Sequence, residues 1–216
     1  MLISHIHHFI FVHIYKNAGT SISTALFPFA TRNPVHRMAV RLAHKLNVRL
    51  PGNLDPFLME SHVSASQIVE RLGQEKFDSY FSFAFVRNPW DWQVSLFTFM
   101  RKYSGHPQHN LIMSFADFDE YIRWRCKWEV RYQKDFVYSV NGKQLVDFIG
   151  KYEHLKDDFS YVCLRCGIQA DLPELNVSKA LPYQNYYTPD TVELVRQTFA
   201  QDILAFDYDF GKIDNP

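Results

Sequence analysis

Residues 16–21, Lys-Asn-Ala-Gly-Thr-Ser, combine a cation with hydroxyl and amide donors in one short turn. The apolar run Phe9–Ile14 before it suits a buried strand, and the small and hydroxylated residues after it suit the start of a helix. A strand-to-helix turn aims free backbone N–H groups and the positive end of the helix dipole at one point. Such a point attracts phosphate-like anions, and Lys16 adds a full charge. Asn17 and Gly19 are expected to take the sharp or positive-φ backbone of the turn.

The turn differs from the common glycine-rich phosphate motifs. A Walker A loop ends in Gly-Lys-Ser/Thr, whereas here Lys16 precedes Gly19, and the sequence has no Gly-x-Gly-x-x-Gly. Taken alone, the turn therefore fits two interpretations. It is either an anion-binding loop or an ordinary strand-to-helix turn with one exposed lysine.

A second pair of anion-binding side chains follows the apolar run Tyr80–Val86, which is typical of an interior strand. Arg87 stands at the end of that strand, Pro89 suits the first turn of the next helix, and Ser95 lies on that helix. A guanidinium and a hydroxyl so placed can bind one phosphate from two sides. Taken singly, the arginine could be a surface ion-pair partner and the serine a routine helix residue.

Strands alternate with helices along the chain. Strands are expected at Phe9–Ile14, Phe57–His62, Tyr80–Val86 and Val146–Gly150. Helices are expected at 33–50, 64–73, 89–103, 115–128 and 153–166, and from Thr188 onward. This alternation predicts an α/β fold, a single domain over residues 1–216 with a mainly parallel central sheet flanked by helices. Ligands of such sheets bind beyond the carboxyl ends of the strands, where Lys16 and Arg87 are both expected.

Several segments carry weaker signals. Helix 33–50 has an apolar stripe and a basic face of the kind that is usually solvated. Residues 104–114 read as a polar loop, with Ser114 as a plausible N-cap of the next helix. Residues 131–140 give no assignment. The histidines near the N-terminus, His5, His7 and His8, are expected to be frayed.

Composition limits the classes of function. The 216 residues suffice for one substantial core, and 23 Lys and Arg balance 23 Asp and Glu. A zero balance argues against general attraction to nucleic acid or acidic membrane, although a local basic pocket remains compatible with it. Cys163 and Cys166 have no second Cys-x-x-Cys pair, which disfavours a closed zinc site and favours reduced thiols. No apolar run suits a signal peptide or a transmembrane helix, so we expect a cytoplasmic protein without an integral membrane segment. From the charge balance and the cysteine pattern we also expect no nucleic-acid partner and no metal.

The two anion-binding segments, taken together, resemble the PAPS-dependent sulfotransferases, notably the heparan and chondroitin type of carbohydrate sulfotransferase and their bacterial relatives. His13–Ser21 is similar to the family's 5′-phosphosulfate loop, and Phe85–Ser95 is similar to its 3′-phosphate motif. The resemblance continues through Phe148–Glu153 to the segment around residues 202–208. Tyr15 replaces a usual proline, Asn17 a frequent threonine and Gln93 a common arginine.

The resemblance implies transfer of a sulfuryl group from 3′-phosphoadenosine 5′-phosphosulfate (PAPS) to a hydroxyl, on a carbohydrate by family analogy, without a metal. It implies a P-loop-like strand–loop–helix site in which Lys16 is catalytic and the donor is bound by Lys16, Asn17, Ala18, Gly19, Thr20, Ser21, Arg87 and Ser95. A lipid-linked or small-molecule alcohol is an alternative acceptor. The rival functions are a kinase-like phosphotransferase, which would need a Gly-Lys-Ser/Thr order and acidic Mg²⁺ ligands, and a non-catalytic nucleotide-binding module.

Transfer to a hydroxyl also needs a base, and His62 is the predicted one. It follows the expected strand Phe57–Ser61 and precedes a helix start at Ser64, which resembles the position of the family's histidine after the second strand. Glu60 and His13 are the competitors, with His13 expected to pack beneath the loop. An acceptor surface could be lined by Tyr103, His106, His109, Trp124, Trp128 and Tyr132, or these residues could simply pack between helices.

Overall fold

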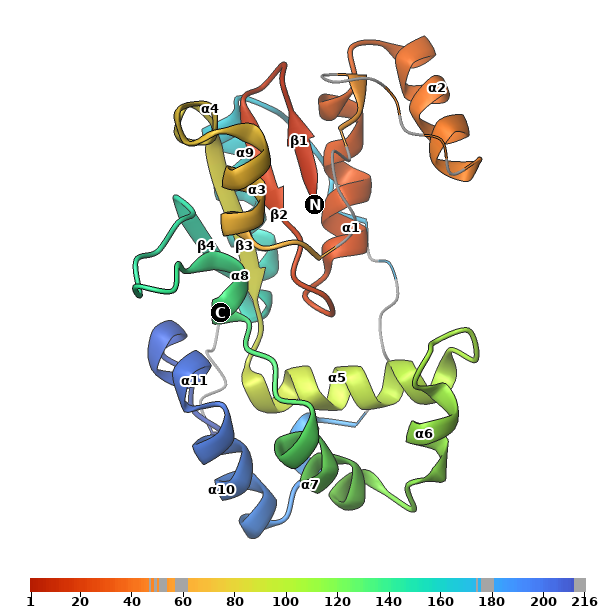
Figure 1. The fold of residues 1–216 in the computed structure, drawn as a ribbon, viewed down its shortest axis with the longest axis vertical. Helices are drawn as coiled ribbons and strands as arrows, with labels where there is room; N and C mark the ends of the chain where they lie inside the picture. The colour runs from red at the N-terminus through yellow and green to blue at the C-terminus, as the bar shows by residue number, and fades with distance from the viewer. Residues whose placement is uncertain are drawn as a thin grey trace. The chain divides into compact units, whose positions relative to one another are not determined.

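The computed structural model describes residues 1–46, 48, 50, 54–56, 62–173, 175 and 181–211. The chain divides into two compact units, and each is built from two segments of sequence. The first unit comprises Met1–Val86 and Asp135–Leu175, and the second comprises Arg87–Lys134 and Asn176–Pro216. The strands of the described ranges all belong to the first unit, whereas the second is helical (Figure 1). A single domain over residues 1–216 stays a prediction.

A mixed sheet organises the first unit. Its strands follow the order β1-β2-β3-β4 and span Leu2–Ser4, Phe9–Val12, Phe81–Val86 and Phe148–Lys151. β1 runs antiparallel to β2, whereas β2 pairs with β3 and β3 with β4 in parallel. The predicted α/β class with a mainly parallel sheet is therefore confirmed. Of the strand expected at Phe57–His62, residues 57–61 lie outside the described residues.

The N-terminal segment is ordered, and the prediction that its histidines fray is wrong. The three residues of β1 are buried, because pairing with β2 places Leu2 and Ile3 in the core. His5 follows β1 directly, and its Nδ1 lies 2.7 Å from the hydroxyl oxygen of Tyr80. A three-residue strand before a histidine-rich turn is too short for its apolar pattern to show in the sequence.

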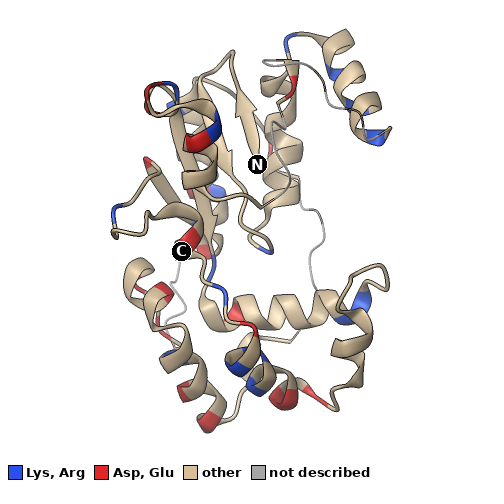
Figure 2. Cartoon of the chain, in the orientation of Figure 1, with Lys and Arg blue, Asp and Glu red and all other residues tan. Residues whose placement is uncertain are grey.

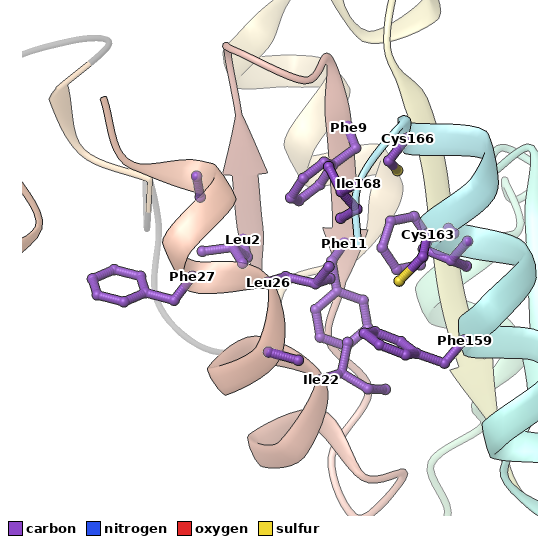
Figure 3. Close-up of a cluster of buried hydrophobic side chains, with 14 of the residues drawn as sticks. Leu2, Phe9, Phe11, Ile22, Leu26, Phe27, Phe159, Cys163, Cys166 and Ile168 are labelled. Atoms are coloured by element: carbon purple, nitrogen blue, oxygen red, sulfur yellow. The ribbon is translucent and has the colours of Figure 1, made fainter. Parts of the chain in front are cut away.

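Helices cover both faces of this sheet. The helices that lie wholly or mostly in this unit are α1 Gly19–Leu26, α2 Pro34–Lys45, α3 Ala65–Leu72, α4 Gln74–Asp78, α8 Lys134–Val137 and α9 Leu155–Cys166, with 3-10 turns η1 Phe27–Ala30 and η3 Tyr152–His154. On one face, Phe9 and Phe11 of β2 meet Ile22 of α1 and Phe159 of α9 (Figure 3). Figure 1 shows α3 and α4 on the face opposite α9. Cys163 and Cys166 of α9 form no disulfide and are buried in this core.

The second unit is a helical assembly. It contains α5 Pro89–Lys102, α6 His109–Ser114, α7 Phe118–Trp128, η4 Tyr183–Tyr186, α10 Pro189–Thr198 and α11 Ala200–Phe206. Trp90, which is fully buried, donates from Nε1 to the carbonyl of Val192 at 3.1 Å and so ties α5 to α10. Phe97 of α5 packs edge-on against Phe118 of α7, with 5.3 Å between ring centroids.

Helix ends agree with the sequence where a capping residue marks them. The Ser64–Gln67 capping box starts α3, Gly73 ends it, and Thr188 caps α10. Two expectations are wrong. The segment 104–114 contains α6 rather than only a loop, and α7 is capped by Asp117 rather than Ser114. Over the ranges that the structure describes, no helix has both the length and the apolar character needed to cross a membrane.

Candidate functional site

The loop between β2 and α1 has a left-handed backbone at two positions. Lys16 has φ 65° and Ala18 has φ 57°, so the prediction that Asn17 and Gly19 take the positive φ is wrong. Ala18 is the N-cap of α1, and no side chain caps that helix end. The first backbone N–H groups of α1 therefore have no side-chain acceptor at the N-cap, and the positive end of the helix dipole adds to their pull on an anion.

Gly19 and Asn17 fix the shape of this loop. A Cβ atom on Gly19 would lie 1.7 Å from Nε2 of His13, so the glycine is required because the imidazole packs directly against it. The Asn17 side chain is buried, and its Nδ2 donates to the carbonyl of Phe85 at 2.8 Å. This bond joins the loop to the carboxyl-terminal part of β3. Gly19 and Asn17 therefore determine the conformation of the loop through their contacts with His13 and Phe85.

Replacing Gly19 by alanine should destabilise the first unit. The added methyl must displace the half-buried His13 ring, and overpacking of this kind costs about 1–3 kcal/mol. In a chain of this size, each kcal/mol lowers the melting temperature by about 2–4 °C. Gly211→Ala is the matched control, since a Cβ there meets no atom within 4 Å. Equal melting temperatures for the two variants would contradict the close approach of His13.

The polar side chains of the loop differ in exposure. Thr20 is exposed at the first turn of α1, and Lys16 is half-buried. Ser21 is buried, and its Oγ accepts a 3.4 Å hydrogen bond from the backbone N–H of Leu175. Thr20 is thus the hydroxyl open to solvent, while Ser21 still has its own O–H to donate.

His62 lies beside this loop. Its Nδ1 is 3.1 Å from the carbonyl oxygen of His13, and its ring meets those of His13 and Tyr15 edge-on, with centroids 4.6 and 5.6 Å away. A carbonyl oxygen only accepts, so Nδ1 carries the proton and Nε2 is left as a proton acceptor. His62 has φ 69°, an unusual backbone for a non-glycine residue, and its contacts with the loop hold it there.

Both histidines are neutral near pH 7. His62 is exposed on one side, but partial desolvation beside the neighbouring rings lowers its pKa, although its hydrogen bond to the carbonyl of His13 opposes the shift. Burial lowers the pKa of His13 to about 3, as expected for a ring packed beneath the loop. A neutral His62 with Nε2 as acceptor is suited to take a proton. The competing residue Glu60 lies outside the described residues.

In the second unit, Arg87 is held by both its side chain and its backbone. Its Nε pairs with Oδ2 of Asp91 at 2.6 Å. One side-chain amide, that of Gln133, accepts from the Arg87 N–H at 2.9 Å and donates to its carbonyl at 2.7 Å. The buried carboxylate of Asp202 in turn accepts from the backbone N–H of Gln133 at 2.9 Å. These contacts fix the position of the Arg87 backbone, and the pair with Asp91 orients its guanidinium.

Ser95 shares a helix face with the carboxylate that binds Arg87. Asp91 and Ser95 are four residues apart on α5, so their side chains lie one above the other. Asn88 fixes the start of this helix, since its side chain accepts from the N–H of Trp90 at 3.1 Å. Arg87 thus precedes the N-cap of α5, and Ser95 lies in the second turn of the same helix. The family's common arginine is here Gln93, which is fully buried.

The six residues considered for an acceptor surface pack against different neighbours, except that Tyr103 and His106 both contact Phe99. Tyr103 stacks on Phe99 at 5.6 Å, whereas Trp124 packs on Phe115 at 5.5 Å and Tyr132 meets Phe199 at 6.1 Å. His106 also contacts Phe99, His109 bonds the carbonyl of Met100, and Trp128 is exposed beside Lys127.

No group of three or more metal-ligating side chains occurs within the described ranges.

Two of the comparisons with known proteins extend over nearly the whole chain, and one covers half of it. A family model described as "Sulfotransferase family" matches residues 1–209. An uncharacterized protein of Archaeoglobus fulgidus is 30% identical over 109 residues, which are 50% of this chain and 85% of that protein. The crystal structure of mouse sulfotransferase SULT7A1 complexed with PAP has a TM-score of 0.59 and 15% identity, and the match covers 95% of this chain and 88% of that one. This likeness confirms the expected fold, and because the family match runs from the loop before α1 through the segment that holds Arg87, the chain belongs to the sulfotransferase family.

Proposed function

We propose that the protein moves a sulfuryl group from PAPS to a hydroxyl of a carbohydrate. The observation that carries the proposal is the start of α1. There, a helix end without a side-chain cap, Lys16, and the neutral His62 belong to one loop region. Membership of the family supports sulfuryl transfer, and PAP bound to mouse SULT7A1 supports PAPS as the donor. The carbohydrate follows from the resemblance of the two motifs to heparan and chondroitin sulfotransferases.

The donor has two anionic ends, and we assign a group of residues to each. The 5′-phosphosulfate is bound by the loop Lys16, Asn17, Ala18, Gly19, Thr20 and Ser21, chiefly through backbone N–H groups, the ammonium and the Thr20 hydroxyl. Asn17 contributes by holding the loop to Phe85. The 3′-phosphate is bound by Arg87, just before α5, and by Ser95, in the second turn of that helix.

The reaction exchanges one bond to sulfur for another. The acceptor oxygen forms a bond to sulfur while the bond from sulfur to the bridging phosphate oxygen breaks, and 3′-phosphoadenosine 5′-phosphate leaves. The proton of the acceptor hydroxyl passes to Nε2 of His62. Negative charge grows on the bridging oxygen, and Lys16 stabilises it. Positioning and charge stabilisation dominate such an in-line transfer, as they do for phosphoryl groups.

Donor recognition predicts a selective thermal shift. 3′-Phosphoadenosine 5′-phosphate should raise the melting temperature more than AMP, ADP or ATP, since only it presents the 3′-phosphate. A ligand at a hundredfold excess over Kd stabilises the folded state by about 2.7 kcal/mol. Arg87→Ala should remove most of this selectivity, as measured by thermal denaturation with each nucleotide.

Arg123→Ala is the matched control. Arg123 pairs with Asp119 through the same Nε–Oδ2 distance of 2.6 Å and the same four-residue spacing, but it lies on α7. This variant should keep the full nucleotide selectivity. Equal stabilisation of the unmodified protein by ATP with Mg²⁺ would instead support the kinase-like alternative.

The acceptor is tested with ³⁵S-labelled PAPS and a panel of glycans, phenols and lipid-linked alcohols. Label on a glycan supports the proposal. Label only on a phenol or a lipid would overturn the carbohydrate assignment while keeping the reaction. Selective nucleotide binding without transfer to any acceptor would favour the non-catalytic binding module.

A further inference from the structure

Helix α2 turns an apolar stripe to solvent. Val35, Met38, Leu42 and Leu46 are 72, 69, 56 and 62% exposed. Their spacing of three or four residues places them on one face. Isolated exposed apolar residues are ordinary on protein surfaces, but a continuous stripe along one helix indicates an interaction surface.

The helix is held to the rest of the first unit by a different face. Val40 is buried at 2% exposure and belongs to the core around α1 and α9. His36 Nε2 lies 2.7 Å from the carbonyl oxygen of Leu54, and Arg37 donates from Nη2 to the carbonyl of Pro28 at 3.2 Å. These contacts fix the orientation of α2 and leave the stripe pointing outward. The stripe is therefore not the face that stabilises the helix.

The same helix is strongly basic. It carries Arg37, Arg41 and Lys45 and no acidic residue, as Figure 2 shows. The asymmetry extends over the sequence around it, because residues 1–54 contain six Lys and Arg and the first acidic residue is Asp55. The rest of the chain holds 17 basic and 23 acidic residues, so the zero net charge hides a basic N-terminal quarter.

We propose that α2 binds the surface of an anionic lipid bilayer, with its apolar stripe in the headgroup boundary and the exposed Arg41 and Lys45 against the lipid phosphates. An interfacial helix needs an apolar face beside lysines and arginines, and α2 has both. Its 12 residues are far fewer than the ~20 that cross a bilayer, so the helix lies on the membrane. The basic side chains of α2 could also bind nucleic acid, but that partner would leave the apolar stripe exposed to water.

Vesicle sedimentation with the whole chain tests this surface. The protein should sediment with vesicles of phosphatidylcholine mixed with phosphatidylglycerol, much less with phosphatidylcholine alone, and less as salt rises. Leu42→Glu should weaken binding at least tenfold, since it removes apolar contact and adds repulsion. Arg41→Ala and Lys45→Ala should each weaken it about fivefold. Because Leu42 is exposed, circular dichroism should show an unchanged fold.

Two control variants separate the stripe from general surface effects. Leu204→Glu alters an apolar residue that is 82% exposed on α11, and Arg123→Ala removes an exposed charge on α7. Both should bind anionic vesicles as the unmodified protein does. Equal binding to neutral vesicles, binding to neither kind, or equal losses in Leu42→Glu and Leu204→Glu would each overturn the proposal. A solution dimer that Leu42→Glu dissociates would assign the stripe to self-association, and duplex DNA binding that survives Leu42→Glu would assign the basic side to nucleic acid.

Discussion

Lys16→Ala should lower kcat by about 10²–10³-fold, by analogy with loss of one oxyanion donor. Charge on the oxygen between phosphorus and sulfur grows as the bond to sulfur breaks. An ammonium beside that oxygen therefore stabilises the transition state more than the bound donor. The affinity for 3′-phosphoadenosine 5′-phosphate should change much less. Steady-state kinetics, combined with the nucleotide-dependent melting temperature, separates the two effects.

Alanine is a suitable replacement because, like lysine, it is an L-residue with a Cβ atom and has the same difficulty with a left-handed backbone. Lys16 has φ 65°, and Ala18 already occupies the same left-handed region at φ 57° in the same loop. The substitution thus removes the ammonium without adding a new kind of strain. Lys143→Ala, which changes an exposed lysine of the same unit, should leave kcat unchanged. A Lys16→Ala enzyme with normal kcat and only a raised KM would make Lys16 a binding residue.

Features encoded by neighbouring residues could be predicted from the sequence. β3 is a run of apolar residues, so its buried position follows from composition alone. The Ser64–Gln67 spacing and Gly73 define both ends of α3 without reference to the rest of the chain. β3 ends at Val86 as predicted, whereas β2 ends at Val12, two residues before the predicted Ile14. This error is small enough that Lys16 and Arg87 could still be assigned to the segments that follow the two strands.

Features that depend on distant residues could not be predicted. Gln133 holds the backbone of Arg87 across 46 positions, and the segment around it has no periodic pattern. Asp202 holds the backbone of Gln133 and so acts on Arg87 only indirectly. The sequence around Asp202 carries no signal for this role apart from the family resemblance of residues 202–208. Ala18 carries no signal for a left-handed backbone, since glycine is the usual residue there. The apolar stripe of α2 was visible, but its exposure depends on which face Val40 places in the core.

His62→Asn should reduce turnover by roughly 10²–10⁴-fold while nucleotide binding persists. Asparagine tolerates the left-handed backbone at φ 69°, and its amide can donate to the carbonyl of His13 as Nδ1 of the imidazole does. The variant therefore keeps the local structure and loses only the proton acceptor. An unchanged thermal shift with 3′-phosphoadenosine 5′-phosphate, measured beside the turnover, shows that the loss is not one of donor binding.

The pH profile gives a second measurement of the same role. A base works in its neutral form, so kcat/KM should fall as the pH drops below the pKa of His62. Burial lowers that pKa, which places the acidic limb below 6.5 and leaves activity level through neutral pH. His13, with a pKa lowered to about 3, titrates too low to produce this limb. The limb should disappear in His62→Asn.

Glu60→Gln discriminates between the two candidate bases. If His62 is the base, the glutamine variant keeps the acidic limb and most of its turnover, because the proton still passes to Nε2. A glutamate base would reverse the pattern, with Glu60→Gln folded but inactive and His62→Asn near normal. An acidic limb that persists unchanged in His62→Asn would also exclude His62 as the base, because the group that titrates would then be another one. The two variants and the position of the limb therefore assign the proton transfer to one side chain.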